Sequence, residues 1–67
     1  MKIGKYTVLA TTVAHQGGFV GTANLTWDEG AETRVQQRHF EKVCRTSADA
    51  EEHVYEQIAL RVQKGEM

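Results

Sequence analysis

The sequence predicts an α+β fold, in which a three-stranded antiparallel β-meander is followed by one C-terminal α-helix packed on one face of the sheet. Up to about Thr46, apolar and polar residues alternate with the period of two that is typical of strands. Glycines at positions 17, 18 and 30 divide this part into three segments. Beyond Thr46, apolar residues recur with the helical period. We therefore predict the order β-β-β-α in a single α+β domain that spans residues 1–67.

The first two predicted strands form a hairpin. The segment 6–13 carries no charge and is rich in β-branched residues, which favours a strand. The pair Gly17-Gly18 tolerates positive φ and is the predicted turn, and residues 19–27 form the second strand. Closing the hairpin at these glycines sets Val8 opposite Trp27. One face of the hairpin is then apolar on both strands, and we expect this face to be buried.

The third predicted strand follows a turn at 28–31 and covers residues 32–43 or 32–44. Its register has two solutions. A four-residue loop aligns Phe40 with Phe19, whereas a three-residue loop turns Val35 inward and Phe40 outward. A bulge in the middle of the strand would satisfy both ends. The four-residue loop also places three polar residues on the apolar side of the sheet, namely Arg34, Gln36 and Arg38.

The predicted helix begins at a capping signal and ends at a glycine. The segments 46–49 and 49–52 both match capping boxes, and their acidic residues suit a helix N-terminus. Arg61 and Lys64 fall in the last turn, before Gly65. The apolar stripe expected to cover the sheet consists of Ala48, Val54, Tyr55, Ile58, Ala59 and Val62. The predicted core of the domain is Val8, Ala10, Ala23, Leu25, Trp27, Val54, Tyr55, Ile58 and Val62.

The composition excludes several classes of protein. The formal net charge is −1, so no overall charge attracts nucleic acid or an anionic membrane. No apolar segment approaches the roughly 18 residues of a transmembrane helix, and no signal peptide is recognisable, so we expect a cytoplasmic protein. The single cysteine, Cys44, can form neither an internal disulfide nor a zinc site by itself.

No combination of residues typical of catalysis or metal binding is present. The candidate ligands His15, His39, His53 and Cys44 are spread along the chain without ligand spacing, so we expect no metal and no cofactor. On the predicted third strand, His39 and Cys44 would point to opposite faces. A domain with one helix over one sheet also leaves little room for a cleft. We therefore expect that the protein is not an enzyme.

One face of the predicted sheet has no element to cover it, and this suggests a protein–protein interaction or accessory module that acts as a homodimer. The residues expected in self-association are Leu9, Val13, Val20 and the exposed helix residue Leu60. The alternative is nucleic-acid binding through a basic stripe on the third strand, made of Arg34, Arg38, Lys42 and Arg45. The same charges would also suit an edge strand that must not pair with other chains.

The order of elements resembles the core of the double-stranded RNA-binding domain and of HicB-like antitoxin modules. Those RNA-binding domains carry a lysine cluster at the start of this helix, where the present chain has acidic residues, namely Asp49, Glu51 and Glu52. Three segments, 6–8, 17–21 and 45–51, resemble the layout of short bacterial proteins that include a HlyU-like family. The resemblance implies a bacterial origin and a similar fold, and it implies no activity.

Overall fold

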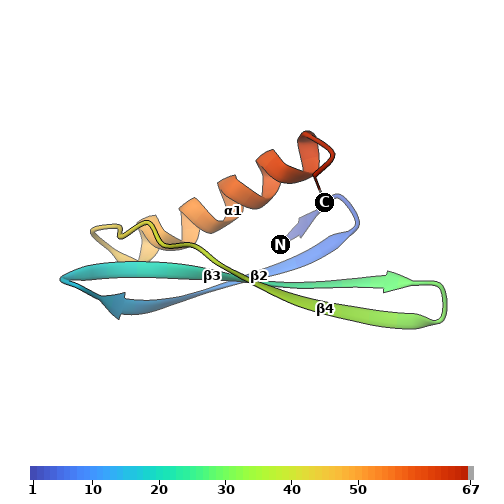
Figure 1. Cartoon of the computed structure of the whole chain (residues 1–67), viewed down its shortest axis with the longest axis horizontal. Helices are drawn as coiled ribbons and strands as arrows, with labels where there is room; N and C mark the ends of the chain where they lie inside the picture. The colour runs from blue at the N-terminus through green and yellow to red at the C-terminus, as the bar shows by residue number, and fades with distance from the viewer. Residues whose placement is uncertain (67) are drawn as a thin grey trace.

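The computed structural model describes residues 1–66 and shows an α+β fold with four antiparallel strands in one sheet and one helix (Figure 1). The elements are β1 (Lys2–Ile3), β2 (Tyr6–His15), β3 (Gly18–Glu29), β4 (Glu32–His39) and α1 (Ser47–Gln63). The strands lie in the order β1-β2-β3-β4. The predicted class is confirmed, but the prediction of three strands is wrong because β1 adds a fourth.

The additional strand β1 is only two residues long and is held against β2 by a tight turn. Gly4 adopts a φ of 58°, which lets the chain reverse so that Ile3 pairs with Tyr6. The N-terminal amine of Met1 donates to the carbonyl of Val8 at 3.0 Å, and the amide of Val8 donates to the carbonyl of Met1 at 2.6 Å. The sequence did not predict β1, because a strand of two residues is too short to show an alternation of apolar and polar residues.

The hairpin of β2 and β3 has the predicted buried face but a different register. Its two-residue turn is Gln16-Gly17, with φ values of 48° and 79°, as a type I′ turn requires. Val8 therefore pairs with Leu25 rather than with Trp27. This shift moves the pairing by two positions, so every side chain keeps its face. Gly18 lies outside the turn and is buried in β3, where a Cβ would collide with the carbonyl of Cys44.

The hairpin of β3 and β4 is also closed by a two-residue turn, Gly30-Ala31, with Glu29 opposite Glu32. Gly30 has a φ of 66° at the first central position, where turns of type II′ place glycine. The predicted turn at 28–31 is therefore shorter, and β4 ends at His39 rather than at Val43 or Cys44.

The facing of β4 follows the four-residue-loop alternative, but its register is wrong, because Phe40 lies beside Gly21 and not opposite Phe19. Phe40 is buried, and its amide donates to the carbonyl of Gly21 at 3.0 Å. Val35 pairs with Thr26 on the sheet face away from α1 and is 72% exposed, so the alternative that turns it inward is wrong. After Phe40 the chain no longer pairs with β3, until Cys44 forms an isolated antiparallel bridge with Phe19.

The helix α1 begins at the predicted cap and packs close to the sheet. The hydroxyl of Thr46 accepts a hydrogen bond from the amide of Asp49 at 3.1 Å. Gly21 makes the close packing possible, since a Cβ at this position would collide with Cγ2 of Val54 and lie 3.0 Å from the carbonyl oxygen of Ala50. Among residues 1–66, no helix is both long and apolar enough to cross a membrane.

The core lies between α1 and the facing side of β2 and β3. Its fully buried large side chains are Val8, Leu25, Val54 and Ile58. All nine predicted core residues belong to the cluster or pack against it. Tyr6, Phe40 and Ala50 are additional buried residues, and the predicted stripe residues Ala48 and Ala59 are exposed.

The helix covers only part of the sheet. It packs against β1, β2 and β3 but not against β4. The hairpin of β3 and β4 extends past the end of the helix (Figure 1). As a result β4 lies at the edge of the sheet with solvent on both faces, and all but one of its residues are exposed.

Candidate functional site

The sheet face that points away from α1, here called the open face, carries apolar and uncharged polar side chains. Leu9, Val13 and Val35 are 62%, 59% and 72% exposed on it. Val13 pairs with Val20, so two of the predicted self-association residues lie side by side. The centre of the open face consists of Leu9, Thr11, Val13, Val20, Thr22, Asn24, Thr26, Val35 and Gln37, with no charged residue among them. A second protein could cover this centre without burying an ionic group.

Polar side chains on the open face bond one another across the strands. Asn24 donates to the carbonyl of Leu9 at 3.1 Å and accepts from the amide nitrogen of Gln37 at 2.8 Å. The hydroxyl of Thr22 and Nδ1 of His39 lie 2.9 Å apart. These bonds link β2, β3 and β4 across the open face.

The other predicted self-association residue lies elsewhere. Leu60 is on α1, 44% exposed, and lines a shallow depression of about 220 Å³ with Gln57, Arg61 and Lys64. It is therefore on the opposite side of the molecule from the open face. The structure brings together Leu9, Val13 and Val20 and leaves Leu60 apart.

The outer edge of β4 is a row of backbone groups without a partner strand among residues 1–66. The amide of Phe40 points to Gly21 of β3, and the direction of backbone groups alternates along an antiparallel strand. The even-numbered residues of β4 therefore bond β3. The N–H and C=O groups of the odd-numbered residues, which are Thr33, Val35, Gln37 and His39, point away from the sheet.

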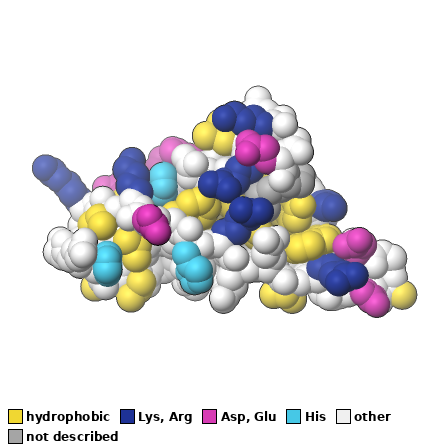
Figure 2. Space-filling view, viewed as in Figure 1, with side chains coloured by type: hydrophobic (Ala, Val, Ile, Leu, Met, Phe, Trp, Pro, Cys, Tyr) yellow, Lys and Arg dark blue, Asp and Glu magenta, His cyan; other side chains and the backbone are white. Residues whose placement is uncertain are grey.

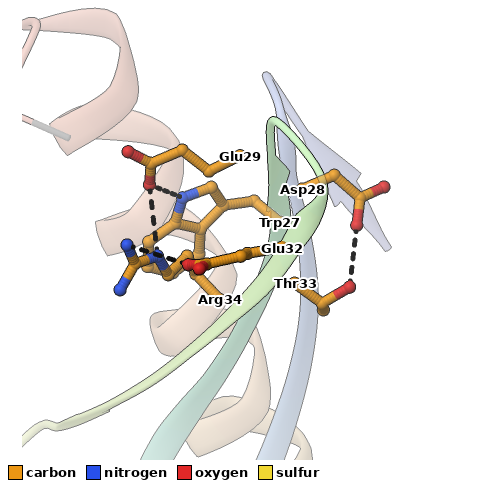
Figure 3. A network of polar contacts seen from close by, with 6 residues as sticks. All are labelled: Trp27, Asp28, Glu29, Glu32, Thr33 and Arg34. Atoms are coloured by element: carbon orange, nitrogen blue, oxygen red, sulfur yellow. Dashed lines mark hydrogen bonds and ion pairs between the residues drawn. The ribbon is translucent and has the colours of Figure 1, made fainter.

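The turn between β3 and β4 is held by polar contacts on both sides of the hairpin (Figure 3). The guanidinium of Arg34 lies 3.6 Å from Glu29 and 3.2 Å from Glu32, and Glu29 also accepts from the indole of Trp27 at 3.4 Å. On the other side, Thr33 donates to Asp28. The charge of Arg34, the first residue of the predicted basic stripe, is thus matched within its own hairpin.

Arg38 lies on the helix side of β4, opposite Ala23, and is partly buried. Its Nε atom is buried and has no hydrogen-bond partner among residues 1–66, so it has lost hydration without a compensating hydrogen bond. Nearby, Arg61 of α1 stacks 5.5 Å from the ring centre of Phe40. Figure 2 shows Lys and Arg side chains gathered where the helix passes over the strands.

The last two residues of the predicted stripe lie outside β4. Lys42 and Arg45 belong to the segment between β4 and α1 and line a cavity of about 340 Å³. The same cavity is lined by three carboxylates, from Asp49, Glu52 and Glu56. The four basic residues therefore do not form one continuous stripe. Arg61 was not part of the predicted basic stripe. It lies beside Phe40 because Phe40 faces the helix, and the sequence had left the facing of Phe40 open.

The residues considered for catalysis and metal binding are separate. Nδ1 of His39 faces Thr22, while the thiol of Cys44 lies 3.9 Å from the carbonyl of Lys42. His53 packs edge-on against Phe40. Within residues 1–66, no three His, Cys, Asp or Glu side chains gather in an arrangement that could hold a metal ion.

Comparisons with models of protein families, with curated proteins and with solved structures found no match to this chain. The resemblance to HlyU-like proteins and to the RNA-binding fold stays a prediction.

Proposed function

We propose that this chain is a small, non-enzymatic protein–protein interaction module that acts as a homodimer. The observation that carries the proposal is the exposure of β4, a strand of eight residues that has no partner strand on its outer edge among residues 1–66 and that α1 leaves uncovered. An exposed edge strand is a template for another strand. No proline and no bulge interrupts Glu32–His39 to prevent this pairing.

The open face supports the part of the proposal that describes an interaction module. It is continuous with β4, and Val35 belongs to both surfaces. Its centre has exposed apolar side chains and no charge, which is the composition expected of the interior of an interface more than of its rim. A domain of 67 residues buries only about 60% of its unfolded surface, so association adds burial that the single chain lacks.

Sedimentation velocity over a range of concentrations tests the proposal. We expect the apparent mass to rise from that of a 7.5 kDa monomer toward twice this value as concentration increases. A monomer that persists at millimolar concentration would contradict the proposal. The same samples titrated with labelled oligonucleotides at low salt examine the alternative, for which binding should weaken steeply as salt is added.

A further inference from the structure

We infer that two copies of this chain pair edge to edge through β4, in one antiparallel register, to form a continuous eight-stranded sheet. The inference rests on the proposed homodimer and specifies its contact. It places Val35 opposite Val35 of the second copy, on the two-fold axis. The resulting cross-strand pairs are Thr33 with Gln37, Arg34 with Gln36, and Glu32 with Arg38, each formed twice.

The backbone of β4 permits this pairing. In the proposed register the odd-numbered residues of one copy meet odd-numbered residues of the other. These are the residues whose N–H and C=O groups point away from β3. Thr33, Val35 and Gln37 can therefore form the hydrogen-bonded pairs of an antiparallel ladder, while Glu32 and Arg38 occupy a non-hydrogen-bonded pair, in which side chains approach more closely.

Charge disfavours the two registers whose axis lies one residue to either side. An axis through Gln36 would place Arg34 opposite Arg38, and an axis through Arg34 would place two copies of Arg34 together. Like charges directly opposite each other destabilise a sheet. The axis through Val35 instead places Glu32, which is 69% exposed, opposite Arg38 of the second copy. The Glu32 carboxylate would then lie beside the guanidinium of Arg38, whose Nε has no hydrogen-bond partner among residues 1–66.

The remaining surroundings of β4 leave space for a second copy. In this antiparallel pairing the two-fold axis is perpendicular to the sheet, so both helices lie on the same face. Because α1 does not pack on β4, the two β4 strands separate them. Neighbouring strands are about 4.8 Å apart, so β3 and its copy lie about 14 Å apart. The opposite edge of the monomer is less available, because Met1 bonds Val8 and the hydroxyl of Tyr55 accepts from the amide of Ala10 at 3.3 Å.

The same charges explain why pairing would be specific. Arg38 on an exposed edge discourages foreign strands, as charged residues do on the edges of other sheets. In the two-fold register Arg38 meets Glu32 of the second copy, which can accept its hydrogen bonds. The edge is thus repulsive to a random strand and complementary to its own copy. The open faces of the two copies then form one surface that continues across β4.

Cysteine cross-linking tests the register directly, in a Cys44→Ser background that removes the native thiol. Residues in a hydrogen-bonded antiparallel pair have Cα atoms about 5.5 Å apart, within the range that a disulfide spans. We expect Val35→Cys to form a covalent dimer on mild oxidation. Thr33→Cys is the matched control on the same edge. Its two copies would lie about 14 Å apart in the paired sheet, so we expect no covalent dimer. Combining Thr33→Cys with Gln37→Cys should restore cross-linking.

Charge reversal provides a second, reversible measurement. Glu32→Lys or Arg38→Glu alone should weaken dimerisation about tenfold or more, and the two together should return it to near the wild-type value. If the wild type dimerises but neither Val35→Cys cross-linking nor charge-swap recovery is observed, the edge register is wrong while the homodimer stands. Cross-linking of Thr33→Cys as fast as Val35→Cys would equally overturn the register. A wild type that stays monomeric contradicts both proposals.

Discussion

Replacing Ile58 with alanine tests the packing of α1 on the sheet. Ile58 is a fully buried residue on the side of α1 that faces the sheet. Truncation of such a side chain to alanine costs about 2 to 5 kcal/mol. A chain of this length has a free energy of unfolding of about 3 to 10 kcal/mol. Because each kcal/mol lowers the Tm of a small domain by about 4 to 8 °C, a loss of 3 kcal/mol corresponds to a decrease of about 12 to 24 °C.

The assay is thermal unfolding followed by circular dichroism, at one fixed protein concentration because a dimer makes the Tm depend on concentration. Leu60→Ala is the matched control. It removes an aliphatic side chain of equal size from the same helix, two positions away, where the side chain is 44% exposed. We expect Leu60→Ala to melt within a few degrees of the wild type. Equal losses in the two variants would show that the buried side of α1 has been misassigned.

Three further substitutions probe local features. Gly21→Ala should destabilise the domain by about 1 to 3 kcal/mol, because the new Cβ collides with Val54. In a double-mutant cycle, adding Val54→Ala should recover part of this loss, and strictly additive losses would refute the collision. Thr46→Ala should cost about 1 kcal/mol in chemical unfolding by removing the cap, and no loss would contradict the capping bond. Arg34→Gln should lower the free energy of unfolding by less than about 1 kcal/mol, since both ion pairs of Arg34 are exposed. A larger loss, measured by chemical unfolding at high salt, would contradict this expectation.

The buried side of the fold was predictable because it depends on periodicity. The strand residues Val8 and Leu25 and the helix residues Val54 and Ile58 were all assigned to the core from their spacing, and all are buried. The exact pairing was not predictable in the same way. Two adjacent glycines could each occupy the turn, and the choice depends on a contact distant in sequence, the approach of the carbonyl of Cys44 to Gly18.

The candidate site was predictable only in part. The alternation of residues in β2 and β3 placed Leu9, Val13 and Val20 on an uncovered face, as the structure has them. The exposure of Val35 was left open, because a polar strand such as β4 has no apolar face to fix its orientation. The burial of Arg38 Nε arises from tertiary packing, which no local pattern reports.

The central claim is that β4 completes its sheet with a second copy, and amide hydrogen exchange measures this at single residues. The outward amides of Val35 and Gln37 should exchange rapidly in dilute monomer and become protected at concentrations where the dimer forms. The even-numbered amide of Gln36 bonds β3 and should be protected in both conditions. Fast exchange of Val35 and Gln37 in a sample that sediments as a dimer would contradict the account.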